Sequence, residues 1–139
     1  MARTVCLNER HPMIVVDTSA LMAIILDEAQ ASACIGALAA EREVLISAGT
    51  VAEALIVAAR RNVAVDMALL IDEFGFEIVT VTPASARRSA AAYEQWGKGV
   101  HPAGLNFGDC FSYEVARRYA CRLLFVGNGF SETDLESVL

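Results

Sequence analysis

The chain has 139 residues, enough for one domain with its own hydrophobic core. A hydrophobic content of 55% excludes an intrinsically disordered chain, and no apolar run approaches the roughly 20 residues of a membrane-spanning helix. The formal net charge of −6 argues against indiscriminate nucleic-acid binding, because phosphate contacts usually need a basic surface.

The charge is uneven along the chain. Residues 84–122 carry six basic and three acidic side chains: Arg87, Arg88, Lys98, Arg117, Arg118 and Arg122 against Glu94, Asp109 and Glu114. This region is net positive, so the first five of these bases are candidates for contact with a polyanion backbone. An acidic protein can hold such a ligand if metal ions neutralise its acids.

Two features favour a cytoplasmic protein. Residues 1–12 are polar and lack the apolar centre of a secretory signal, so we expect a disordered or extra N-terminal tail before one domain over residues 13–139. The cysteines, Cys6, Cys34, Cys110 and Cys121, show no metal-type spacing. We expect free thiols in a reducing compartment and no zinc site.

The predicted elements alternate between strands and helices. In chain order we expect a strand over 13–16, helices over 20–27 and 30–40, a strand over 43–47, helices over 50–61 and 66–74, a strand over 77–81, a helix over 83–96, a loop over 97–105, a helix from Asn106 and a strand over 123–126. This alternation predicts a single α/β domain with a parallel sheet covered by helices on both faces.

Asp17 closes the first strand, Met13-Ile-Val-Val, and precedes Thr18-Ser19 at the start of a helix. The strand therefore delivers a carboxylate to its carboxyl end, where open α/β sheets bind ligands. Alternatively, Asp17 only orders the turn, with Thr18 or Ser19 as the N-cap.

Two further acids are predicted near the starts of helices. Glu53 follows Thr50 in the S/T-x-x-E pattern of a capping box, and Asp109 lies three residues after a predicted N-cap, Asn106. Each acid thus has a structural explanation. Together with Asp17, however, they would converge on one edge of the sheet, where like charges repel unless a cation binds among them.

Carboxylates without histidine or cysteine favour Mg²⁺ or Mn²⁺ over zinc. Such metals activate water for attack on a phosphodiester. Phosphate-binding loops, nucleophile elbows and dinucleotide-binding glycine motifs are missing from the sequence. His101, in the predicted loop, could contact a phosphate or simply be solvated. A small phosphatase or other magnesium hydrolase of similar architecture remains an alternative.

Three stretches, residues 13–21, 47–54 and 93–113, resemble the PIN-domain toxins called VapC, and Asn106-Phe-Gly-Asp-Cys-Phe-Ser-Tyr is the most specific of the matches. The resemblance implies a PIN-like three-layer α/β/α domain with a short, mainly parallel sheet. It also implies a Mg²⁺-dependent endoribonuclease that cuts structured RNA such as tRNA or ribosomal RNA. It further implies that the protein is the toxin of a type II toxin–antitoxin module and forms a homodimer. A cognate VapB antitoxin would bind this toxin and keep it inactive.

The family's metal acids correspond to Asp17, Glu53 and Asp109, with Thr18 and Ser19 beside the first acid and within reach of RNA. The chain departs from the pattern Lys-Gly-Asn-Asp-Phe after the last strand, because Val126 replaces the lysine and Gly129 the fourth acid. Val100 also replaces a usual arginine in the loop.

The missing fourth acid leaves two possibilities open. Asn128 or Asp134 could substitute as a metal ligand, although Ser131 and Asp134 also fit a simple N-cap pair. We expect reduced activity at low Mg²⁺. The alternative is a degenerate domain that binds its antitoxin or RNA without cutting.

Overall fold

The computed structural model describes residues 13–139, so the predicted tail over residues 1–12 lies outside the described residues. The strands are β1 (Met13–Val16), β2 (Glu43–Ser47), β3 (Glu77–Val79) and β4 (Arg122–Leu124). The helices are α1 (Thr18–Ile25), α2 (Ala31–Ala40), α3 (Ala48–Arg60), α4 (Ala64–Phe74), α5 (Pro83–Trp96), α6 (Phe107–Tyr119) and a short 3₁₀ turn, η2 (Gly129–Glu132).

The four strands form one parallel sheet in the order β3-β2-β1-β4. β1 lies in the interior of the sheet, where Val15 pairs with Leu45 of β2 and with Leu123 of β4. The predicted parallel sheet is confirmed, and β3 is two residues shorter than predicted. Because all strands run the same way, their carboxyl ends meet at one edge.

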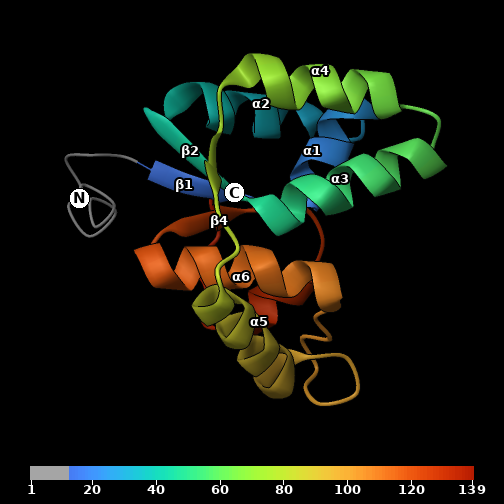
Figure 1. Ribbon diagram of the computed structural model, residues 1–139. Coiled ribbons are helices and arrows are strands. Elements are labelled where there is room, and N and C mark those ends of the chain that lie inside the picture. Colours follow the sequence, from blue (N-terminus) through green and yellow to red (C-terminus); the bar gives the residue numbers. More distant parts are fainter. Residues whose placement is uncertain (1–12) are drawn as a thin grey trace.

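Helices cover both faces of this sheet. α1–α4 lie on one side and α5 and α6 on the other (Figure 1). Successive strand residues point to opposite faces, so Ile14 and Val16 enter the core under α1–α4, while Met13 and Val15 enter the core under α5 and α6. The expected three-layer α/β/α arrangement is therefore confirmed.

Two of the predicted helix caps differ from those in the structure. Asp17 itself is the N-cap of α1, which begins at Thr18 rather than Ala20. The Thr50–Glu53 capping box is wrong, because Ser47 caps α3 by accepting a hydrogen bond from Gly49 N–H, and the strand runs directly into the helix. The predicted cap of α6 is confirmed, with reciprocal bonds between Asn106 and Asp109.

The cysteines are only partly as predicted. Cys34 and Cys110 are free and buried, whereas Cys121 is disulfide-bonded, so the expectation of a free thiol is wrong there. Cys6 lies outside the described residues. Over residues 13–139, the helices are too short or too polar to cross a bilayer.

Candidate functional site

Asp17 lies at the carboxyl end of β1 and is only 2% exposed. Its Oδ2 accepts hydrogen bonds from the backbone N–H of Ser19 at 3.0 Å and from the Ser19 hydroxyl at 2.8 Å. Its Oδ1 accepts a bond from the hydroxyl of Ser112, on α6, at 2.6 Å. Because these donors come from two separate segments, they fix a buried carboxylate that would otherwise be costly to desolvate.

Glu53 approaches the same edge from the second turn of α3. Its Oε1 accepts a hydrogen bond from the Thr18 hydroxyl at 2.7 Å. The carboxylate lies against Gly108 of α6, where an added methyl group would overlap Oε2. A glycine at this position therefore leaves the space that the Glu53 carboxylate occupies.

Asp109 completes the group from the first turn of α6. Its Oδ2 accepts a bond from Asn106 N–H at 2.9 Å. The pKa of Asp109 is raised to about 7, chiefly by burial and also by the negative charges of Asp17 and Glu53, against the opposing hydrogen bond from Asn106. Burial also raises the pKa of Glu53. The hydrogen bond from Thr18 lowers this pKa, and the negative charge of Asp17 raises it. The three predicted acids therefore share one electrostatic environment.

These carboxylates do not form a closed ligand cluster as they lie. Within residues 13–139, no three His, Cys, Asp or Glu side chains stand close enough together to hold a metal ion. Glu53 and Asp109 each direct one oxygen to a neighbouring donor instead. Their chemistry still fits a hard divalent cation, because all donors are carboxylate oxygens and a cation would relieve their repulsion.

Ser19 and Thr18 are positioning residues in this geometry. Besides binding Asp17, the Ser19 hydroxyl accepts a bond from Val126 N–H at 3.0 Å and so ties the segment after β4 to the start of α1. Ser112 was missed by the sequence analysis, and it also shares a 3.2 Å bond with the buried hydroxyl of Thr50. The sequence gives one indication of its role, because Ser112 follows Asp109 by three residues and residues at this spacing lie on the same face of a helix.

Asp134 is engaged elsewhere. Its Oδ1 accepts a bond from the Tyr113 hydroxyl at 2.8 Å, and its Oδ2 lies 3.5 Å from Arg117 Nε. The N-cap pair expected of Ser131 and Asp134 is wrong, because Ser131 donates to the carbonyl of Asn128 within η2. Tyr113 and Arg117 of α6 thus hold Asp134.

The basic candidates lie mainly in the α5–α6 layer. Arg88 and Arg118 both bind Glu114, and Arg87 and Lys98 are exposed. His101 organises the loop rather than standing free in solvent. Its Nδ1 accepts a hydrogen bond from Ala103 N–H at 3.0 Å. Its ring packs edge-on against that of Trp96, with 4.7 Å between the ring centroids.

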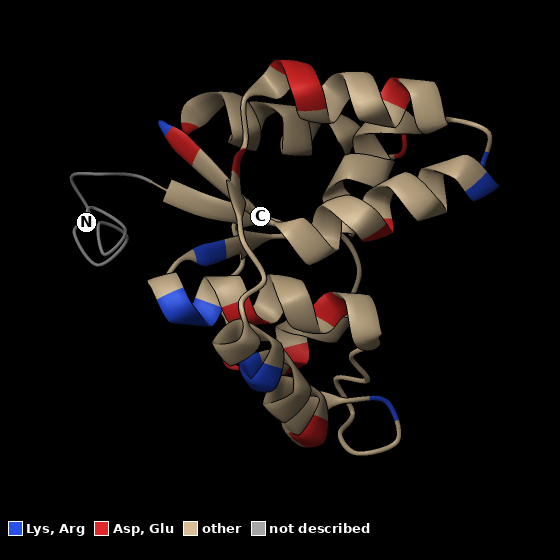
Figure 2. Cartoon of the chain, viewed as in Figure 1, with Lys and Arg blue, Asp and Glu red and all other residues tan. Residues whose placement is uncertain are grey.

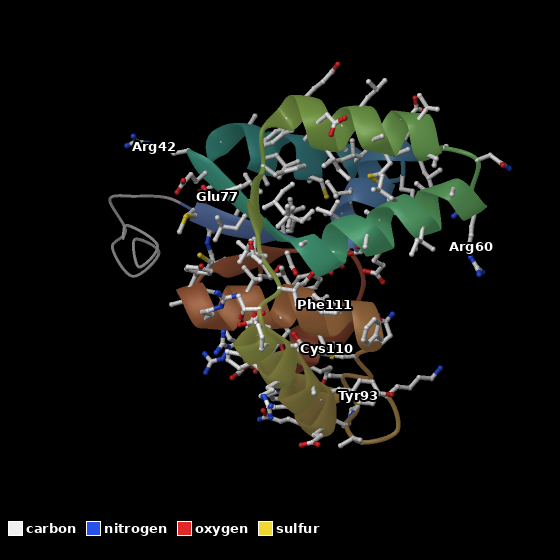
Figure 3. All side chains as sticks on the ribbon, viewed as in Figure 1. Arg42, Arg60, Glu77, Tyr93, Cys110 and Phe111 are labelled. Atoms are coloured by element: carbon white, nitrogen blue, oxygen red, sulfur yellow. The ribbon has the colours of Figure 1, made fainter. Side chains whose placement is uncertain are left out.

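Two apolar hollows flank the start of α6, and the sequence analysis missed both. The larger, of ≈ 550 Å³, lies between α5 and the start of α6, and the smaller, of ≈ 280 Å³, lies between α3 and α6. Phe107 and Phe111 line both hollows, and Glu53 lines the smaller one. Phe107 is 77% exposed. Figure 3 shows Tyr93, Cys110 and Phe111 of the larger hollow together on the α5–α6 layer.

The chain matches a family model and known proteins over most of its length. The PIN domain family model matches residues 14–136. Ribonuclease VapC28 of Mycobacterium tuberculosis is 41% identical over 130 residues, which cover 91% of this chain and 98% of the relative.

Solved structures share the fold. The crystal structure of Mycobacterium tuberculosis VapC20, described as a sarcin-ricin loop cleaving toxin, superposes with a TM-score of 0.75 at 20% identity and covers 90% of this chain and 98% of that one. A toxin–antitoxin complex from Klebsiella pneumoniae gives a TM-score of 0.65 at 17% identity, covering 87% and 92%.

Proposed function

This chain belongs to the PIN-domain family of VapC ribonucleases, and we propose that it is the toxin of a type II toxin–antitoxin module, a Mg²⁺-dependent endoribonuclease. The observation that carries the proposal is the approach of Asp17, Glu53 and Asp109 from β1, α3 and α6, with raised pKa values for Glu53 and Asp109. Structured RNA, tRNA or ribosomal RNA, is the proposed substrate class.

Asp17, Glu53 and Asp109 would hold the divalent cation, Mg²⁺ or Mn²⁺. Bound there, the cation would lower the pKa of a water molecule and stabilise the leaving oxygen of a phosphodiester. Ser19 and Ser112 fix Asp17, while Thr18 orients Glu53. Glu53 and Asp109 are the candidates to orient the attacking water, because one oxygen of each accepts from Thr18 or Asn106 and the second oxygen of each can accept from the water.

Metal removal tests the activity. Purified protein incubated with total tRNA and with ribosomal RNA should cleave in Mg²⁺ or Mn²⁺, lose cleavage in excess chelator, and recover it when the metal is restored. Gel analysis of end-labelled RNA measures the rate. Cleavage that persists in chelator would contradict a metal-dependent mechanism, whereas hydrolysis of small phosphate monoesters and not of RNA would favour the phosphatase alternative.

Gly129 allows a direct test of the degenerate alternative. It follows β4, the strand beside β1, and a Cβ added there would lie 3.1 Å from the carbonyl oxygen of Ala103, so a small shift suffices to accommodate aspartate. We expect Gly129→Asp to raise cleavage at low Mg²⁺ by about tenfold, through tighter metal binding.

Gly36→Asp is the matched control, because it adds the same charge on α2 in open space. A control that rises equally would contradict the role of Gly129. Activity that is measurable only in Gly129→Asp would favour the alternative, a domain that binds its antitoxin or RNA without cutting.

The proposed partners are a VapB-type antitoxin and a second copy of the chain, and the proposed compartment is the cytoplasm. The Klebsiella pneumoniae structural neighbour, a toxin–antitoxin complex, supports the antitoxin. The exposed Phe107 beside an apolar hollow supports a homodimer, because a two-fold interface is self-complementary and a protruding ring can fill the hollow of the second copy. Arg87, Lys98 and His101 remain proposed RNA contacts.

A further inference from the structure

A second charged cluster lies toward the end of α6, whereas Asp109 lies in the first turn of this helix. Glu114 is only 4% exposed, and its Oε2 lies 2.8 Å from Arg88 Nε of α5 and 2.8 Å from Arg118 Nε of α6. Arg118 Nη2 also donates to Oε1 at 3.1 Å. A hollow of ≈ 320 Å³ lies over this cluster, and Arg117 and Gln95 line it together with both arginines.

The cluster holds more positive charge than its buried carboxylate needs. One arginine would neutralise Glu114, yet two guanidinium groups converge on the same oxygen and repel each other. A third guanidinium group belongs to Arg117, and its Nε lies 3.5 Å from an oxygen of Asp134. The Arg117 side chain is 56% exposed. An anion in the hollow would relieve this repulsion.

The arginines also keep donors for such an anion. A guanidinium group carries five N–H donors in a planar fork, and the bond from Arg88 to Glu114 uses its Nε. The side chain of Arg88 is 49% exposed, so its outer edge faces the hollow and solvent. Glu114 holds both arginines in place, which lowers the entropy lost when they bind a ligand.

We propose that this hollow, lined by Arg88, Arg117 and Arg118, binds a phosphate group of the RNA backbone. The inference rests on the proposed ribonuclease function and assigns a substrate contact outside the acidic site. Arginine forks match the geometry of phosphate oxygens. Arg117 follows Asp109 by eight residues on α6, about 12 Å along the helix axis, so one RNA strand can reach both places.

The surrounding charge supports this assignment. Figure 2 shows Lys and Arg at the end of α6 and on neighbouring α5, with Asp and Glu also present on both helices. In a chain with a net charge of −6, a hollow lined by three arginines gives the phosphate backbone a local favourable contact. Such a contact positions RNA without reading its sequence.

Binding of labelled single-stranded RNA, measured by fluorescence anisotropy in chelator across a salt series, tests the proposal without cleavage. Arg88→Gln and Arg117→Gln should each weaken binding several-fold for unrelated RNA sequences and lower the salt slope of log affinity by about 0.7. Arg118 still pairs with Glu114 in the first variant, and the second leaves that pair untouched, so both should fold.

Arg60→Gln is the matched control, since Arg60 lies on α3 in the opposite helical layer (Figure 3). It should bind RNA with wild-type affinity and slope. Folded Arg88→Gln and Arg117→Gln proteins with wild-type RNA binding would overturn the proposal, as would an equal loss in Arg60→Gln. Loss of affinity for an acidic partner protein with unchanged RNA binding would also overturn it.

The measurement separates this inference from the proposed activity. RNA binding in chelator needs no catalysis, so a wild-type protein that binds RNA through the hollow but never cleaves it would contradict the ribonuclease proposal alone. Metal-dependent cleavage together with RNA binding that is insensitive to Arg88 and Arg117 would contradict the phosphate site alone.

Discussion

Replacing Asp17 with asparagine should lower RNA cleavage by at least about a hundredfold, the cost typical of removing one electrostatic contact to a transition state. The amide keeps the shape of the side chain but removes the charge from the centre of the acidic group. Its oxygen can still accept from Ser19, and its NH₂ can donate to Ser112, whose hydroxyl can turn toward Thr50. Alanine would instead leave these donors without an acceptor and destabilise the protein, so a loss of activity could not be separated from a loss of stability.

Cleavage rates of end-labelled tRNA, with thermal unfolding as the check on folding, measure this effect. Asp72→Asn is the matched control, because it makes the same charge change on the exposed surface of α4. Asp17→Asn should unfold within about 5 °C of the wild type. Equal cleavage by the wild type and a folded Asp17→Asn protein would rule out Asp17 as a participant.

The second large effect is expected from a single methyl group at Gly108. Alanine normally stabilises a helix by roughly 0.5–1 kcal/mol relative to glycine. At Gly108, however, the new methyl group would overlap Glu53 Oε2. The end of a glutamate side chain can rotate away, so the fold should survive while the carboxylate leaves its position. We expect cleavage to fall by at least about tenfold, because a misplaced group loses much of its catalytic contribution.

Gly36→Ala is the control for this substitution, because Gly36 is also helical and has open space around its Cα. It should be stabilised slightly and keep wild-type cleavage. Rates and melting temperatures of both variants distinguish the two effects. A Gly108→Ala protein that cleaves at the wild-type rate would contradict the position assigned to Glu53.

Local patterns predicted part of this site well. The apolar strand ending in Asp17 and the Asn106–Asp109 cap are both short-range features, and the structure contains both. The Thr50–Glu53 capping box failed for a physical reason: Ser47 ends a strand and caps the helix at once, so Thr50 enters the core and Glu53 turns to Thr18. A pattern of spacing cannot show which of two hydroxyl residues begins a helix.

The remaining contacts depend on tertiary packing. Ser112 reaches Asp17 across 95 positions of sequence, and Arg88 reaches Glu114 across 26. The count of basic residues over 84–122 indicated a positive region, but it did not show that two arginines share one buried carboxylate. The hollows around Phe107 could not be predicted from the sequence either, because they form only where α3, α5 and α6 pack together.

Direct metal titration tests the central proposal, that Asp17, Glu53 and Asp109 together bind one divalent cation. Calorimetry with Mn²⁺ at neutral pH should show binding to the wild-type chain. Asp17→Asn, Glu53→Gln and Asp109→Asn should each weaken it by at least about tenfold, and Asp72→Asn should leave it unchanged. Wild-type Mn²⁺ affinity in all three site variants, or no binding by the wild type, would contradict the proposal.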